Sequence, residues 1–484
     1  MLNNVKSILI LKKIFANVKN KRKLNFIKYN KRITKRLDIN KEYFERFARL
    51  KKFNIKFNQN IEDTDIEELN LSQKYINKEE LKYLAEVKFK ELKVLNLNRN
   101  NLTDISMLKD VNFNELKVLI LTNNYISNID ILEKVNFEKL IELNLSNNKV
   151  SNIDILEKVN FRELKILNLS NNRLQNVNIL EKVNFEELNV LDLSNNLLIY
   201  VNILEKVNFR ELKILNLSNN KLSTDINVLE KVNFRKLKEL DLSANYITYI
   251  DILEKVNFNE LNKLDLAGNR ISNINILEKV NFHELKELDL TGNRISNINI
   301  LEKVNFHQLK ELDLSRNRIS NINILEKVNF HELNKLDLSN NNISDIDILE
   351  KVNFPKLEIF DLRSNKISNI NALKNVNFEK LKVLELSYNQ ISDINILEKV
   401  NFKDLRELYL RGNEISNIDI LEKVDFKNLN KLDLSWNKIT NINIFKKVDF
   451  KELNDLCLGD NEINEKENYL IITNLKSKIK KFII

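Results

Sequence analysis

Three histidines offer the most direct route to metal chemistry in this sequence. His283, His307 and His331 follow one another at intervals of 24 residues, so a regular fold would bring them to equivalent places. Imidazole nitrogens stacked in this way could hold a transition metal. The equivalent places elsewhere in the chain carry Arg, Glu, Asn or Lys, which favours copies of one surface residue. We therefore predict no metal site and no cofactor.

A second set of candidates is charged and follows the same interval. Aspartates recur every 24 residues, and basic residues recur five residues after many of them. Two parallel charge stripes could set the register and association rate of a protein partner, or they could be solvated faces that neutralise each other. The acidic stripe contains Asp265, Asp289, Asp313 and Asp337, with related residues at Asp192, Asp241, Asp361, Glu385 and Asp433, and the basic stripe contains Arg270, Arg294 and Arg318.

The pattern holds no recognisable catalytic machinery. There is no glycine-rich nucleotide motif and no phosphate loop. No Ser/His/Asp set converges, because the histidines fall outside the positions of the acidic stripe. Cys457 is the single cysteine, so it forms no disulfide within the chain and fits a reducing compartment. We predict that Cys457 is a partly buried neutral thiol, that the protein is not an enzyme, and that it is cytoplasmic.

These side chains are positioned by a repeat of 24 residues. Phenylalanine recurs at this interval sixteen times, with a single step of 25 between Phe209 and Phe234. One unit, residues 282–305, reads FHELKELDLTGNRISNINILEKVN, and sixteen such frames fill residues 89–464. The recurring phenylalanines are residues 89, 113, 137, 161, 185, 209, 234, 258, 282, 306, 330, 354, 378, 402, 426 and 450.

Each unit divides into parts with distinct physical roles. Leu288 and Leu290 alternate with polar residues, which predicts a short strand. Three residues later every frame has an asparagine, whose amide can bond backbone groups in a tight turn. Stacked units would turn these amides into a ladder, which explains how a chain with 4 glycines and 1 proline makes so many turns. The predicted ladder includes Asn269, Asn293, Asn317 and Asn341.

The rest of the unit predicts one helical turn. Asn299 and Glu302 have the spacing of an N-cap residue and its capping-box glutamate. They would open a short helix from Ile300 to about Val304, and Phe306 would close the coil on the opposite side. A coiled coil or one long helix is excluded, because the apolar residues keep neither a 3.5- nor a 3.6-residue period.

The string LxxLxLxxNxI, read here as Leu285, Leu288, Leu290, Asn293 and Ile295, resembles the leucine-rich-repeat signature. The continuation ISxIxxL is similar to intracellular repeats of protein-phosphatase regulatory subunits and bacterial internalins. The resemblance implies an α/β fold, a curved solenoid with a parallel β-sheet on its concave face and short helical turns on the convex side. It also implies protein binding on the concave face.

The repeats diverge from one another most informatively near the end of the array. Tyr388, Tyr409 and Trp436 occur in three successive repeats at inner-face or rim positions, with Arg411 beside them. Tyr, Trp and Arg dominate the energetics of protein interfaces. We predict that residues 385–438 form the main contact patch. The alternative is that these are isolated surface aromatics without a binding role.

The N-terminal segment differs in charge from everything that follows it. Residues 1–58 have a net charge of +15, and the remainder has −6. We predict short basic helices in residues 1–58, a degenerate first repeat at 59–88 and a C-terminal cap at 465–484. The stretch 10–37 resembles an F-box-like module, which implies a cullin-type ubiquitin ligase partner bound through residues 1–50. Nucleic acid or an acidic membrane is a less favoured partner.

The sequence therefore predicts a non-enzymatic scaffold for protein–protein interaction, monomeric, with a protein partner on the concave face. The alternatives left open are a substrate adaptor of a ubiquitin ligase and association with nucleic acid or membrane through the basic segment.

Overall fold

The computed structural model describes residues 32, 35, 41–111, 113–223, 225–448 and 451–484. The chain divides into two compact units, Met1–Leu191 and Asp192–Ile484, which are described separately. The predicted F-box-like stretch and the first two predicted N-terminal helices lie outside the described residues, apart from two isolated positions. No helix in the described ranges is long and apolar enough to cross a membrane.

Each repeat of the first unit contributes one three-residue strand to a parallel sheet. Neighbouring strands pair without a shift in register, so that Leu95 lies opposite Leu119 and Leu119 opposite Leu143. The middle residue of each strand is buried, and its two neighbours face outward. The strands are β1 (Glu68–Asn70), β2 (Val94–Asn96), β3 (Val118–Ile120), β4 (Glu142–Asn144) and β5 (Ile166–Asn168), and β6 (Val190–Asp192) follows at the boundary of the units.

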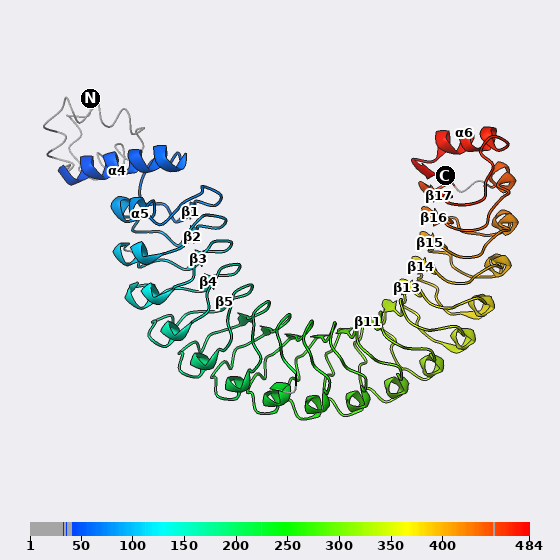
Figure 1. Cartoon of the computed structure of the whole chain (residues 1–484), viewed down its shortest axis with the longest axis horizontal. Helices are drawn as coiled ribbons and strands as arrows, with labels where there is room; N and C mark the ends of the chain where they lie inside the picture. The colour runs from blue at the N-terminus through cyan, green and yellow to red at the C-terminus, as the bar shows by residue number, and fades with distance from the viewer. Residues whose placement is uncertain (1–31, 33–34, 36–40, 112, 224, 449–450) are drawn as a thin grey trace. The chain divides into compact units, whose positions relative to one another are not determined.

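The second unit continues the same arrangement along its own length. Its strands pair in parallel, again without a shift, and line the inner side of this unit (Figure 1). We call the surface made by the first and third residues of these strands the sheet face. The strands are β7 (Ile214–Asn216), β8 (Glu239–Asp241), β9 (Lys263–Asp265), β10 (Glu287–Asp289), β11 (Glu311–Asp313), β12 (Lys335–Asp337), β13 (Ile359–Asp361), β14 (Val383–Glu385), β15 (Glu407–Tyr409), β16 (Lys431–Asp433), β17 (Asp455–Cys457) and β18 (Lys481–Ile483).

Short 3-10 helices lie on the side of each coil opposite its strand (Figure 1). In the first unit they are η2 (Ser106–Asp110), η3 (Asp130–Lys134), η4 (Asp154–Glu157) and η5 (Asn178–Glu181). In the second unit they are η6 (Asn202–Glu205), η7 (Asp225–Glu230), η8 (Asp251–Glu254), η9 (Asn275–Glu278), η10 (Asn299–Glu302), η11 (Asn323–Glu326), η12 (Asp347–Lys351), η13 (Asn371–Asn375), η14 (Asn395–Glu398), η15 (Asp419–Glu422) and η16 (Asn443–Lys446).

The predicted capping box is wrong. In η10 the flanking residue at the N-terminus is Ile298, which makes no side-chain cap. The backbone N–H of Asn299 instead donates to Oδ1 of Asn297 at 2.8 Å. Glu302 lies 3.8 Å from the ammonium of Lys327 in the next repeat. The turn that opens η10 is therefore an Asx turn made by Asn297, and Glu302 forms an ion pair between coils, because a four-residue 3-10 helix forms no α-helical first turn.

Every coil closes around an apolar interior. Phe282 is 1% exposed, and Leu285 and Ile295 are fully buried. Burying a side chain of this size contributes about 1.5–3 kcal/mol, and each coil shares its apolar surface with the next coil. The prediction of a leucine-rich-repeat solenoid, with parallel strands on one side and short helical turns on the other, is confirmed.

Helices cover the ends of the apolar interior. In the first unit α4 (Lys41–Phe57) packs against α5 (Lys82–Val87), where the ring of Phe53 contacts those of Phe57 and Phe89 edge to face. In the second unit α6 (Tyr469–Lys478) buries Ile471, Ile472 and Leu475. The last strand, β18, then pairs with β17.

Candidate functional site

The ladder asparagines join each coil to its neighbours. Asn293 is 7% exposed, and its Nδ2 donates to the carbonyls of Leu266 in the preceding repeat and Leu290 in its own, at 2.9 and 3.0 Å. Its Oδ1 accepts the backbone N–H of Ile271 at 3.0 Å. Equivalent bonds are made by Asn269, Asn317 and Asn341. These residues hold the turn that follows each strand.

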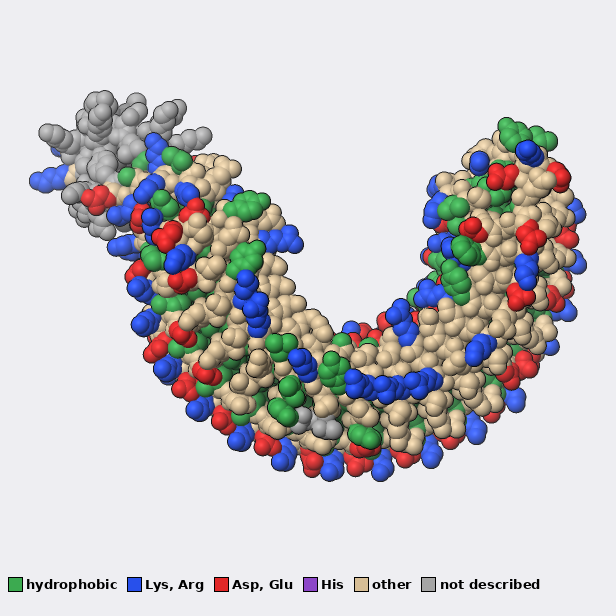
Figure 2. All heavy atoms as spheres, viewed as in Figure 1, with side chains coloured by type: hydrophobic (Ala, Val, Ile, Leu, Met, Phe, Trp, Pro, Cys, Tyr) green, Lys and Arg blue, Asp and Glu red, His purple; other side chains and the backbone are tan. Residues whose placement is uncertain are grey.

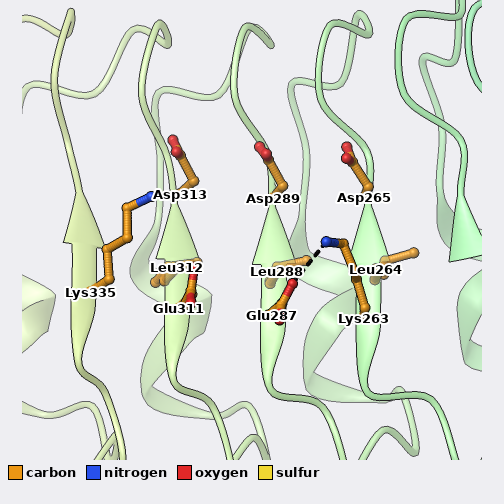
Figure 3. Close-up of a pocket in the computed structure, with 10 residues that line it drawn as sticks. All are labelled: Lys263, Leu264, Asp265, Glu287, Leu288, Asp289, Glu311, Leu312, Asp313 and Lys335. Atoms are coloured by element: carbon orange, nitrogen blue, oxygen red, sulfur yellow. Dashed lines mark ion pairs between the residues drawn. The ribbon is translucent and has the colours of Figure 1, made fainter. Parts of the chain in front are cut away.

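The acidic stripe lies at the third strand position and caps the same turn. The Oδ1 of Asp289 accepts the backbone N–H of Thr291 at 2.8 Å, and Asp265, Asp313 and Asp337 accept the N–H two residues further on in the same way. Figure 3 shows Asp265, Asp289 and Asp313 side by side at the ends of three strands. The stripe therefore has a structural role in each turn, in addition to any role in binding.

Burial and mutual repulsion alter the acidity of this stripe. Burial raises the pKa of Asp265 to about 6, and the neighbouring carboxylates Asp289 and Asp241 add to the shift. Burial likewise raises the pKa of Asp361 to about 7, with a further contribution from Asp337. The pKa of Glu385 is also raised, chiefly by burial. These carboxyls of the stripe therefore hold their protons to a higher pH than a free carboxyl does.

A shallow hollow on the sheet face lies over β9 to β12 (Figure 3). Its floor is leucine and its walls are charged, with the ammonium of Lys263 2.9 Å from the carboxylate of Glu287. Lys335 extends toward the row of aspartates from the opposite side. Charges of both signs meet here, so the hollow is no simple anionic site.

The basic stripe runs along the edge of the sheet face, one residue beyond the ladder. Arg270, Arg294 and Arg318 are exposed, and Figure 2 shows basic side chains in a band over the middle of the second unit. The guanidinium of Arg270 lies 4.6 Å from the ring centre of Tyr246. No ion pair of these three arginines is found within the described ranges.

The aromatic residues of the predicted patch lie in unusual backbone positions. Tyr388 and Trp436 immediately precede ladder asparagines and have φ of 55° and 56°. Equivalent positions hold Gly268, Gly292 and Asn340, residue types that adopt left-handed backbone at low cost, but also residues without that advantage, such as Ala244, Arg316 and Ser364. The two rings are 45% and 53% exposed. The left-handed backbone is thus a property of the repeat, and it is the large exposed rings of Tyr388 and Trp436 that point to function.

Arg411 joins the two rings into one cluster. Its guanidinium carbon lies 5.8 Å from the ring centre of Tyr388 and 5.5 Å from that of Trp436, and its Nε donates to the Tyr388 hydroxyl at 2.8 Å. Gly412 lies under the Tyr388 ring. We call Tyr388, Arg411, Gly412 and Trp436 the rim cluster.

Tyr409 stands apart from the rim cluster, on the strand β15. Its hydroxyl donates to Glu407, and the ammonium of Lys431 lies 4.8 Å from its ring centre. Burial first, and then the bond to Glu407, raise the pKa of Tyr409. Tyr409 thus occupies the place that acidic residues hold in the neighbouring repeats, opposite Glu385 and Asp433.

Sequence reasoning missed three residues of this region. Ile359 and Val383 pair at the first position of β13 and β14, where most second-unit strands carry Lys or Glu, and Ile359 is 38% exposed. Two apolar residues in a row of charged ones are a signal in the sequence that could have identified Ile359 and Val383. Gly412 was also missed, although a glycine between Tyr388 and Trp436 in the repeat alignment could have drawn attention to it. Figure 2 shows apolar and basic side chains together in this part of the unit.

The remaining chemical candidates have ordinary surroundings. His283, His307 and His331 are exposed, and the ring of His283 bonds Asn305. No group of three metal-binding side chains is found in the part of the chain that the structure describes. Cys457 is 8% exposed, and burial raises the pKa of its thiol to about 11. A thiol of this kind is a poor nucleophile at neutral pH.

Comparison with family models gives matches along the array. The model "Leucine Rich repeats (2 copies)" matches residues 331–375 and 379–423, and single-copy leucine-rich-repeat models match residues 427–442, 211–231 and 308–327. A search of curated proteins finds no match.

Comparison with solved structures gives the same fold. An internalin from Listeria monocytogenes is 28% identical, with a TM-score of 0.55, over 66% of this chain and 87% of its own. A leucine-rich-repeat protein of Leptospira interrogans is 22% identical, with a TM-score of 0.54, over 87% and 90%. The ectodomain of an Arabidopsis thaliana receptor kinase, in complex with Casparian strip integrity factor 2, is 23% identical, with a TM-score of 0.54, over 79% and 48%. Matching family models, structural neighbours and repeat geometry together make this chain a leucine-rich-repeat protein.

Proposed function

We propose that the protein is a non-enzymatic scaffold that binds a protein partner on the sheet face, with residues 385–438 as the main contact patch. The observation that carries the proposal is the rim cluster, in which one arginine contacts two exposed aromatic rings from neighbouring repeats. Rigid aromatic and arginine side chains are the usual energetic centres of protein interfaces.

The surroundings of the rim cluster support this proposal. Ile359 and Val383 provide an apolar area on the same sheet face, and the strands beneath are paired in parallel. A rigid surface loses little conformational entropy on binding. The fold also suits this role, since the receptor-kinase ectodomain of similar fold is in complex with a protein ligand. The charge stripes would then set register and association rate.

The other predicted partners have less support. A ubiquitin-ligase linker, nucleic acid or membrane would bind through residues 1–50, most of which lie outside the described residues. No observation favours them. A cytoplasmic location and a monomeric state stay predictions, the first of which depends on the single cysteine.

The test is capture of partners by the immobilised full chain from a lysate of its source. A double variant, Tyr388→Asn with Trp436→Asn, removes both rings and keeps a residue that the chain itself uses at this left-handed position, as at Asn340. We expect captured partners to bind it about 30-fold more weakly, which corresponds to about 2 kcal/mol. Thermal unfolding should be unchanged, because both rings are exposed.

The matched control changes two tyrosines that are somewhat more exposed and lie away from the sheet face. Tyr200 and Tyr249 are 61% and 67% exposed and precede η6 and η8, where other repeats have asparagine, such as Asn297. Tyr200→Asn with Tyr249→Asn should capture the same proteins as the natural chain. Equal capture by both double variants would reject the contact patch, and equal loss of capture and of thermal stability would show that the rings are structural.

A further inference from the structure

Arg411 differs from the arginine at the same place two repeats earlier. Arg363 also lies two residues beyond its strand, and its Nη2 is 3.7 Å from the carboxylate of Asp361 in its own repeat. In the repeat of Arg411 that acidic residue is replaced by Tyr409, which bonds Glu407 instead. Over the described ranges no carboxylate lies within ion-pair distance of Arg411. Arg411 therefore lacks, within its own repeat, the carboxylate partner that Arg363 has.

The guanidinium of Arg411 is nevertheless held in place. Its Nε donates to the hydroxyl of Tyr388, and the rings of Tyr388 and Trp436 both lie within cation–π distance. The terminal amino groups have no hydrogen-bond partner among the described residues. A planar fork with fixed orientation and unused donors is suited to bidentate recognition of an oxyanion.

Gly412 is what allows this arrangement. Its φ is +64°, and a Cβ added there would lie 2.6 Å from Cδ1 of Tyr388, well inside contact distance. Gly292 occupies the equivalent place in another repeat, with φ of +65°, and a Cβ there would meet its nearest neighbour at an ordinary 3.6 Å. The steric requirement for glycine is therefore particular to the repeat that carries Arg411.

We propose that the rim cluster binds the carboxylate of an aspartate or glutamate side chain in an extended segment of the protein partner, with Arg411 as the bidentate donor. This inference rests on the proposed function and names the chemistry of the partner at the contact patch. A carboxylate is favoured over a phosphate because one guanidinium matches one negative charge, and Glu385 and Asp433 lie on the adjacent strands. Ile359 and Val383 would receive apolar residues of the same segment.

The chain carries its own reporter for this site. Trp436 is the single tryptophan, so intrinsic fluorescence reads the rim cluster directly. The probe is a short capped peptide of alternating valine and glutamate, titrated into the full chain. We expect a saturable change in fluorescence that weakens as salt is added. A matched valine–glutamine peptide should bind about tenfold more weakly, equal to about 1.4 kcal/mol.

Three variants separate the parts of the cluster. Arg411→Lys keeps the charge and loses the planar fork, so peptide affinity should fall about tenfold. Gly412→Asn keeps the left-handed backbone, as Asn340 does, but displaces the Tyr388 ring, and should weaken the glutamate peptide without altering the glutamine peptide. The control Gly292→Asn should match the natural chain in both titrations.

Several results would overturn the inference. The first is that the glutamate peptide gives no saturable fluorescence change. The second is that the Arg411→Lys variant binds this peptide as tightly as the natural chain does. The third is that a phosphoserine peptide binds more tightly than the glutamate peptide. Failure here is distinct from failure of the proposed function. Loss of partner capture in the aromatic variants with no peptide binding would reject only the carboxylate site. Peptide binding that depends on Arg411, with capture unchanged in those variants, would reject only the contact patch.

Discussion

Replacing one ladder asparagine should unfold the array locally, and the structure sets the size of the effect. Asn293→Ala removes three donated bonds and one accepted bond. The three carbonyls keep other donors, from Asn269, Asn317 and the backbone N–H of Gly268. The backbone N–H of Ile271 loses its acceptor altogether. One buried, unsatisfied donor costs about 1–3 kcal/mol, so we expect a loss in that range rather than the sum of four bonds.

Hydrogen exchange of the full chain, read by mass spectrometry, is the appropriate assay. A long array need not unfold in one cooperative step, so a single unfolding free energy is not well defined. Protection should fall most at Ile271 and in the two coils that Asn293 joins, since coils contact only their neighbours. The control is Asn299→Ala, which removes an exposed amide from the same repeat and should change protection little. Unchanged protection at Ile271, or an equal loss along the whole array, would refute the reasoning.

Two further predictions concern the titratable groups. The pKa of Asp361 is raised to about 7, so the folded state binds its proton more tightly than the unfolded state and loses stability as pH rises through 7. Asp361→Asn retains the acceptor that Asn144 provides in its own repeat. Hydrogen exchange in the coil of β13 should therefore find it more stable than the natural chain at pH 8, by at most about 4 kcal/mol, with the difference shrinking by pH 5. A difference independent of pH would contradict this origin. Cys457 is buried with a pKa raised to about 11, so iodoacetamide at pH 8 should modify it at least about tenfold more slowly than a free thiol, and equal rates would show that the thiol is accessible.

The coil itself could be read from the sequence because the same constraint appears in every repeat. Leu288 and Leu290 flank one outward residue, and that alternation specifies a strand with a buried face. Asn293 recurs where a turn must follow. The capping box failed because the side chain that accepts the backbone N–H of Asn299 is that of Asn297, two residues earlier, and Glu302 pairs with Lys327 in the next coil. Spacing within one repeat could not reveal the partner in the next coil.

Three members of the rim cluster could be picked out from the sequence, but their mutual contacts could not. Tyr388, Arg411 and Trp436 were recognisable as residue types that suit an interface, and Tyr409 was grouped with them on the same grounds. The structure brings the first three together and places Tyr409 on a strand beside Glu407 and Lys431. Stacking without register shift decides this, because residues 24 apart become neighbours only when the coils are superposed.

The amino-acid pattern alone determined the repeat, its strand, its asparagine turn and its apolar interior, since each depends on residues within one coil or on identical residues in adjacent coils. Only the tertiary structure decided what the divergent residues do. The Tyr388 ring lies over Gly412, Glu302 pairs with Lys327, and the guanidinium of Arg411 contacts the rings of Tyr388 and Trp436. These contacts depend on side-chain directions at left-handed and strand positions of different coils, which no spacing within a single repeat encodes.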